Sequence, residues 1–118
     1  ALFYAIEGNH TETAIYLANQ GANVRRTDLE GLTPTLVAAR IGNAKIIRAL
    51  LEKGAIVDAA PIRGVTPLYI ATMLKHREAM EVLIEYGASL DFSDTYGYTP
   101  AALAASKGDV ESLKIIIR

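Results

Sequence analysis

A step of 33 residues recurs along this sequence, and it limits the possible folds more than any other feature. The pattern Gly-x-Thr-Pro keeps this step, beginning at Gly31, Gly64 and Gly97. A column of small apolar residues keeps it as well, namely Ala5, Ala38, Ala71 and Ala104. A fixed period of about 20 to 50 residues is typical of a solenoid. We therefore expect a row of similar units, each packed only against its neighbours, rather than a globule with one central core.

The composition fits a packed protein and excludes several classes of function. Of the 118 residues, 51% are hydrophobic and 21% are charged, which argues against disorder and leaves room for a single domain. The net charge of −1 and the scattered basic residues give no support for nucleic-acid binding. The chain has no cysteine, which excludes disulfides, thiolate metal sites and a cysteine nucleophile. This absence fits an intracellular, cytoplasmic location.

The ends of the sequence and its charge distribution give two further expectations. The longest uncharged stretches, such as 95–106, are shorter than the roughly 20 residues of a membrane span, so we expect no membrane insertion. The sequence begins without methionine inside a helical pattern, and its last residues, LKIIIR, stop in the middle of one. We therefore expect a piece of a longer chain.

Residues 28–60 illustrate the expected unit. The Asp, Gly and Pro of DLEGLTP favour a tight loop or a short hairpin. Thr33 is a suitable N-cap and Pro34 a suitable first residue for a short helix that ends at Gly42. A second helix follows in AKIIRALLEK and carries its apolar residues on one face. Neither helix is long enough to be stable alone, so the units must stack.

The sizes of the side chains in the two helices predict a curved stack. The first helix of each unit is rich in alanine, whereas the second carries isoleucine and leucine. Small residues let the first helices approach closely, and larger ones hold the second helices further apart. We therefore expect an arch with the first helices and the loops on its inner side.

The segments DLEGLTPTLVAARIGN, PIRGVTPLYIATMLKH and DTYGYTPAALAASKGD resemble the ankyrin repeat. The pattern of that family is Asp-x-x-Gly-x-Thr-Pro-Leu-His-x-Ala-Ala-x-x-Gly-His, followed by a helix rich in Val and Leu and by Gly-Ala-x-x-Asn. The resemblance implies an all-α solenoid of helix-turn-helix units joined by short β-hairpins or turns. It covers the whole chain as one domain, with a partial repeat (1–27), two complete repeats (28–60 and 61–93) and a partial fourth (94–118).

The sequence departs from the family pattern at several positions. The histidine after Thr-Pro-Leu is replaced by Leu36, Tyr69 and Ala102. The hydrogen bonds that this histidine supports are therefore in doubt. Thr35 and Ala101 stand where a core leucine is usual, which predicts slightly looser packing. Lys75 occupies a helix-ending position where two other repeats have glycine, so we expect it in the left-handed region at a cost of about 1 kcal/mol.

No arrangement of residues for catalysis or for a cofactor is visible. His10 and His76 occupy one column just after the first helix, where a structural role explains both. Glu78, Glu81 and Glu85 share one face of a helix with basic residues nearby, as on an ordinary solvated surface. No spacing typical of metal ligands or of a phosphate-binding loop occurs. We therefore expect a non-enzymatic protein without a metal or a cofactor.

The resemblance implies that another protein or peptide binds on the inner face of the arch. The candidate residues at the loop tips are Leu29, Glu30, Leu32, Ile62, Arg63, Val65, Tyr96 and Tyr98. The candidate residues at the ends of the first helices are Arg40, Ile41, Met73, Leu74, Ser106 and Lys107. Many are apolar, and two interpretations remain open. In the first, these residues form a continuous apolar stripe that binds a partner, with the tyrosines as its main contacts. In the second, some of them fold back onto the neighbouring loop.

A second possible function is structural. The last residues Ile115, Ile116 and Ile117 have no following repeat to cover them, and the first repeat lacks its loop. Terminal repeats normally present a polar outer face. The open ends could therefore pack against flanking repeats, another domain or other copies of the chain, and the protein would then act as a spacer or an assembly scaffold.

Overall fold

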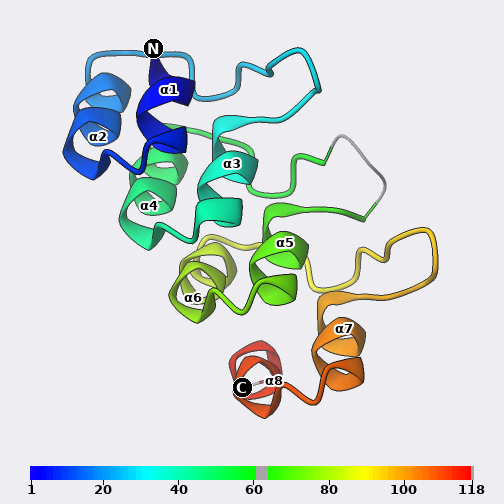
Figure 1. The fold of residues 1–118 in the computed structure, drawn as a ribbon. Coiled ribbons are helices and arrows are strands. Elements are labelled where there is room, and N and C mark those ends of the chain that lie inside the picture. Colours follow the sequence, from blue (N-terminus) through cyan, green and yellow to red (C-terminus); the bar gives the residue numbers. More distant parts are fainter. Residues whose placement is uncertain (61–63, 118) are drawn as a thin grey trace.

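The computed structural model describes residues 1–60 and 64–117, and it confirms the row of stacked helix pairs. The pairs are α1 (Leu2–Glu7) with α2 (Thr11–Asn19), α3 (Pro34–Ile41) with α4 (Ala44–Glu52), α5 (Pro67–Met73) with α6 (Arg77–Glu85), and α7 (Pro100–Ser106) with α8 (Val110–Ile117). The four pairs follow one another along a molecule 39 Å long (Figure 1).

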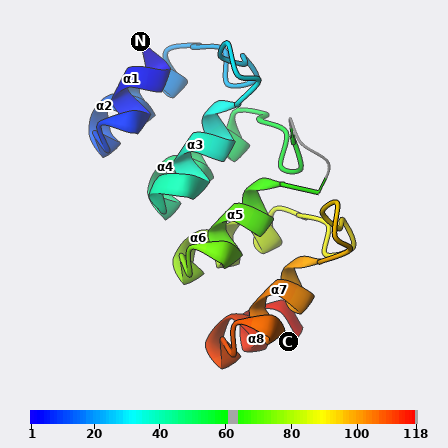
Figure 2. The ribbon, with the colours of Figure 1, turned by 45° about the vertical axis from the view of Figure 1, so that its right-hand side comes forward.

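The helices form two rows. The first helices α1, α3, α5 and α7 pack against one another in one row, and α2, α4, α6 and α8 form the other (Figure 1). The loops before α3 and α7, and the described part of the loop before α5, extend to one side of the first row (Figure 2). The described parts of these loops contain no strand, so they are turns rather than β-hairpins.

An aspartate side chain organises the turn before α3 and the turn before α7 in the same way. Asp28 Oδ1 accepts hydrogen bonds from the backbone N–H groups of Glu30 and Leu32 at 2.8 and 2.9 Å. The backbone N–H of Asp28 in turn donates to the carbonyl oxygen of Leu32 at 3.0 Å. Asp94 makes the equivalent contacts in the loop before α7. The repeated aspartate therefore gives these two turns one shape.

The Thr-Pro pairs begin the first helices as predicted. Thr33, Thr66 and Thr99 each accept a hydrogen bond at 3.2 Å from the backbone N–H three residues further on. In each case proline is the first helical residue, where a missing N–H costs nothing. Because this threonine cap recurs at one position of the repeat, α3, α5 and α7 all begin at that position.

The core runs through the whole stack. The predicted alanine column is buried at all four positions, which allows the first helices to pack closely. Large side chains from both rows fill the space between the pairs, including Ile6, Ile47, Leu50, Leu68, Met80 and Leu83. The expectation that the last three isoleucines are uncovered is wrong for two of them. Ile115 and Ile116 are buried because α8 packs on α6 and α7, whereas Ile117 is exposed.

Lys75 adopts the predicted left-handed conformation, with a φ of 63°. A side chain raises the energy of this conformation by about 1 kcal/mol relative to glycine. Lys75→Gly should therefore raise the free energy of unfolding by up to about 1 kcal/mol, as measured by urea denaturation. Lys53 follows α4 with a φ of −92° and serves as the control. Lys53→Gly should not stabilise the protein, and equal effects of the two changes would contradict the prediction.

Thr35 is fully buried, and its hydroxyl Oγ1 has no hydrogen-bond partner among the described residues. An unpaired buried hydroxyl costs roughly 1–3 kcal/mol. Thr35→Val replaces the hydroxyl by a methyl group of the same shape, so it should raise the free energy of unfolding by about 1 kcal/mol. Thr72 is equally buried, but its hydroxyl donates to the carbonyl oxygen of Leu68 at 2.7 Å. Thr72→Val should therefore destabilise the protein, and a gain for both variants would contradict the explanation.

Candidate functional site

The structure places the described candidate residues on the loops and at the ends of α3, α5 and α7. Ile62 and Arg63 lie outside the described residues. The exposed candidates are Leu29, Glu30, Arg40, Met73, Leu74, Tyr96, Tyr98, Ser106 and Lys107. The half-buried candidates are Leu32, Ile41 and Val65. Leu32 and Ile41 pack against the core rather than lying on the surface. The exposed apolar candidates are Leu29 in the loop before α3, Met73 and Leu74 at the end of α5, and Tyr96 and Tyr98 in the loop before α7.

The loop before α7 presents two tyrosines on a well-held turn. Tyr96 is 86% exposed and Tyr98 is 42% exposed. Their backbone N–H groups both donate to Asp94 Oδ1 at 2.9 Å. The hydroxyl of Tyr69, on α5, donates to the other carboxylate oxygen of Asp94 at 2.6 Å. The buried Asp94 thus joins the loop to α5, and both rings project from a turn that is fixed to the helix row.

The same hydrogen bonds shift two pKa values. The bond from Tyr69, together with the backbone N–H donors, lowers the pKa of Asp94 below its ordinary value. The bond to Asp94 and partial burial raise the pKa of Tyr69 to about 12. Both groups therefore keep their charge states at neutral pH, with Asp94 ionised and Tyr69 protonated. Tyr69 occupies the column of the family's histidine, and its hydroxyl makes a hydrogen bond between neighbouring repeats.

Polar contacts also link neighbouring repeats at the C-terminal ends of the first helices. His76 Nε2 lies 3.1 Å from the carbonyl oxygen of Arg40, to which it donates a hydrogen bond. Lys107 Nζ donates to the carbonyl oxygen of Met73 at 3.2 Å. These contacts assign His76 the structural role that its position predicted. The ammonium group of Lys107 is likewise held against the end of α5.

One column of the first helices is exposed in all four pairs, and the first member of this column was not among the predicted residues. The column consists of Glu7, Arg40, Met73 and Ser106. Every other column of these helices contains at least one buried or half-buried residue. Glu7 was missed because the candidates were taken from the loops and from the three later helices, although the 33-residue step identifies it.

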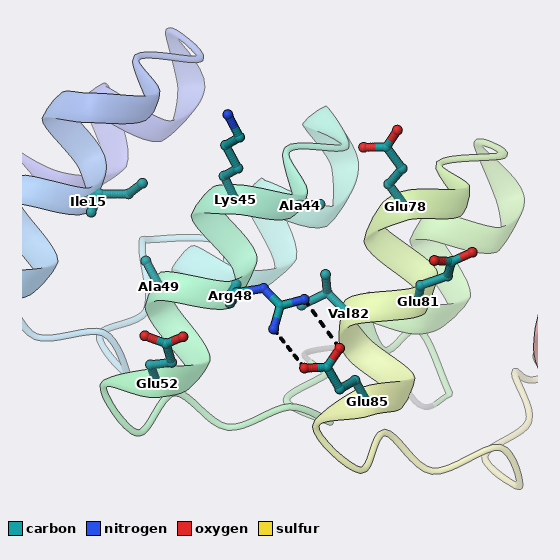
Figure 3. A pocket seen from close by; sticks show the side chains of 10 residues that line it. All are labelled: Ile15, Ala44, Lys45, Arg48, Ala49, Glu52, Glu78, Glu81, Val82 and Glu85. Atoms are coloured by element: carbon teal, nitrogen blue, oxygen red, sulfur yellow. Dashed lines mark hydrogen bonds and ion pairs between the residues drawn. The ribbon is translucent and has the colours of Figure 1, made fainter.

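A groove of about 560 Å³ lies on the opposite side of the molecule, where α4 and α6 face solvent (Figure 3). It is lined by Ile15, Ala44, Lys45, Arg48, Ala49, Glu52, Glu78, Glu81, Val82 and Glu85. Arg48 extends between the two helices and donates to both carboxylate oxygens of Glu85, at 2.7 and 3.2 Å. These hydrogen bonds raise the pKa of Arg48 and lower that of Glu85. The guanidinium carbon also lies 5.8 Å from the ring centre of Tyr86, so Arg48 links α4 to α6.

Within 1–60 and 64–117, no three His, Cys, Asp or Glu side chains are grouped so that they could hold a metal ion. None of the described helices is both long enough and apolar enough to cross a bilayer.

Comparison with known families agrees with this architecture. A family model for ankyrin repeats, built from three copies, matches residues 1–61 and again residues 56–118. No curated protein matches the chain. Ankyrin repeats are generally protein–protein interaction modules and are typically not enzymes. Because the two matches together span the whole sequence, the chain belongs to the ankyrin-repeat family.

Proposed function

We propose that this protein binds a partner protein through its loop face, meaning the exposed sides of α1, α3, α5 and α7 together with the loops before α3, α5 and α7. The observation that carries the proposal is the exposure of apolar and aromatic side chains on this face, Met73 and Leu74 at the end of α5 and Tyr96 and Tyr98 in the loop before α7. Tyrosine combines a large contact area with a polar tip, and it is enriched among the residues that dominate binding energies.

The chemistry of the two long faces favours the loop face. The outer face of α4 and α6 carries Lys45 and Arg48 on one helix and Glu78, Glu81 and Glu85 on the other. Charged residues are depleted in the buried cores of protein interfaces, because their desolvation costs free energy. The loop face offers four exposed apolar and aromatic residues for such a core, with charged residues such as Glu7, Glu30 and Arg40 around them, whereas the exposed side chains of α4 and α6 are mainly charged.

The test begins with ligands selected from a displayed peptide library against the wild-type domain. Their affinities are then measured for the double variant Tyr96→Ser/Tyr98→Ser and for the outer-face control Lys45→Ser/Glu78→Ser. We expect the tyrosine variant to lose at least about tenfold in affinity, since aromatic anchors contribute much of the binding energy. The control should change affinity by less than about twofold. Ligands that respond only to the outer-face change would overturn the proposal.

Folding of the tyrosine variant can be checked independently. Serine keeps the backbone N–H groups that Asp94 binds at both positions, so the turn retains these hydrogen bonds. Thermal unfolding followed by circular dichroism should therefore show a cooperative transition close to that of the wild type.

Assembly through the ends of the stack is a second candidate function, favoured by residues that change exposure between repeats. Ala105, on α7, is exposed, whereas Ala39 and Thr72 in the same column are fully buried by the next helix pair. Tyr4, on α1, is 81% exposed, whereas Val37 in its column is buried. Light scattering over a range of concentrations tests self-association: a monomer at every concentration would contradict pairing between copies of the chain.

A further inference from the structure

The chain contains two methionines, and the structure gives them opposite surroundings. Met73 is the last residue of α5, lies on the loop face and is 37% exposed. Met80 lies on α6 and is fully buried. Because the sequence has no cysteine, these two thioethers hold its only sulfur atoms. An oxidant in solvent therefore reaches one thioether of the folded protein, that of Met73.

The 33-residue step shows which side chains each methionine position tolerates. The column of Met73 holds polar or charged residues in the other three helix pairs, all of them exposed, namely Glu7, Arg40 and Ser106. The column of Met80 holds apolar residues that belong to the core or pack against it, namely Ala14, Ile47 and Leu113. A polar group in place of the thioether of Met73 therefore leaves the packing of the repeats intact, whereas one at Met80 would disrupt the core.

We propose that Met73 is an oxidant-sensitive modification site, and that its conversion to methionine sulfoxide weakens partner binding at the loop face. With hydrogen peroxide, a sulfur lone pair attacks one peroxide oxygen, the O–O bond breaks, and the other oxygen leaves as water after taking up the remaining proton. The sulfur loses two electrons and the peroxide gains them. Sulfoxide reductases return the thioether, so the modification is reversible. This inference rests on the loop-face function proposed above and adds its regulation.

Oxidation changes the loop face at a point where the proposed binding depends on apolar contact. Met73 is followed by Leu74, which is 42% exposed. A sulfoxide is polar, and its oxygen needs hydrogen bonds that an apolar partner surface does not supply. Lys107 Nζ donates to the carbonyl oxygen of Met73 at 3.2 Å, which holds the backbone at this position. The modification therefore removes hydrophobic contact without moving the end of α5.

The site assignment is tested by treating the folded domain with hydrogen peroxide and following each methionine by peptide mass spectrometry. Met80 reacts only in molecules that have unfolded, which are about one in a thousand or fewer in a stable domain. We therefore expect Met73 to be oxidised at least about a hundredfold faster than Met80. In urea that unfolds the chain, the two rates should be similar. Similar rates in the folded protein would overturn the assignment.

The effect on binding is measured with the ligands selected for the test of the proposed function. Peroxide treatment should weaken their binding to the wild type at least about fivefold, and methionine sulfoxide reductase with dithiothreitol should restore it. Met73→Leu keeps an apolar side chain of similar volume but has no sulfur at this position, so peroxide should not change its affinity. Unchanged affinity of the oxidised wild type, or an equal loss in Met73→Leu, would overturn the inference.

Met73→Gln separates an effect on the surface from an effect on the fold. Glutamine is polar and similar in length to methionine, so we expect it to weaken binding about as much as oxidation does. Its thermal unfolding midpoint should stay within about 3 °C of the wild type, because the other repeats carry polar residues in this column. A much larger fall would mean that polarity at this position acts through unfolding, and it would overturn the proposed regulation.

Failure of this inference can be distinguished from failure of the proposed function. If the selected ligands depend on Tyr96 and Tyr98 but bind the oxidised domain as well as the untreated one, the loop face binds partners without using Met73, and the inference alone is wrong. If the ligands do not depend on the loop face, the proposed function is wrong and its regulation is wrong with it, whatever the oxidation rates are.

Discussion

Gly64→Ala should lower the free energy of unfolding by about 3–4 kcal/mol, whereas Gly97→Ala should lower it by only about 1 kcal/mol. The two glycines occupy equivalent positions in their loops, and both are left-handed, with φ values of 76° and 86°. The conformational cost of adding a side chain is therefore similar. Their surroundings differ, because a Cβ at Gly64 would overlap the backbone of Ser93 and Asp94, whereas no atom lies within 4 Å of a Cβ at Gly97.

Comparing Gly64→Ala with Gly97→Ala isolates the effect on stability of the contact between the loops before α5 and α7. Urea denaturation of the two variants gives two losses of stability, and their difference measures how tightly the loop before α5 packs on the loop before α7. Flexible side chains can move aside, but the backbone of Ser93 and Asp94 is held by the Asp94 turn, so the overlap cannot be relieved without displacing that turn. Equal losses for the two variants would show that the loops are not in backbone contact.

The fold could be predicted because its main determinants are local or periodic. The 33-residue step located the buried alanine column, the Thr-Pro caps followed from hydrogen bonding within one turn, and the conformation of Lys75 followed from the glycine at the same position of other repeats. Each of these depends on the backbone alone or on residues close in sequence.

The links between repeats could not be predicted in the same way. Tyr69 and Asp94 are 25 residues apart, and Arg48 and Glu85 are 37 apart. A column assigns each residue to a position in its repeat, but the side-chain conformation decides which neighbour it reaches. The half-burial of Leu32 and Ile41 has a similar cause, since their exposure depends on packing against the core. The sequence therefore assigned the candidate residues to loops and helix ends, whereas their individual exposure depended on packing that only the structure gives.

Asp109→Ala should lower the free energy of unfolding by about 3 kcal/mol, because it removes a buried carboxylate with three hydrogen bonds. The side chain of Asp109 is 2% exposed and lies just before α8. Its Oδ1 accepts from the guanidinium of Arg77 at 2.8 Å and from the backbone N–H of Ser112 at 3.2 Å. Its Oδ2 accepts from the hydroxyl of Ser112 at 2.6 Å. The alanine variant leaves α8 without its cap and Arg77 without its partner.

The same contacts predict how the contribution of Asp109 depends on pH. Hydrogen bonds from Arg77 and Ser112 lower the pKa of Asp109 to about 2 from an ordinary value of 3.8. Between these values the unfolded chain takes up a proton that the folded protein does not bind, so the stabilisation is complete above about pH 4 and is lost as the pH falls towards 2. It amounts to about 1–2 kcal/mol, since Arg77 is partly exposed and water screens the pair.

Asp109→Asn separates this titration from the loss of the cap. Asparagine keeps an oxygen that can accept from Ser112, as at other N-caps, but it has no proton to gain in acid. The wild type and the variant share every other carboxylate, including Asp94 and Glu85 with their lowered pKa values, so those contributions cancel in the comparison. Urea denaturation at pH 6 and at pH 2.5 should therefore show a smaller loss of stability in the variant than in the wild type. Equal losses would mean that the contacts with Arg77 and Ser112 do not lower the pKa of Asp109 in the folded protein.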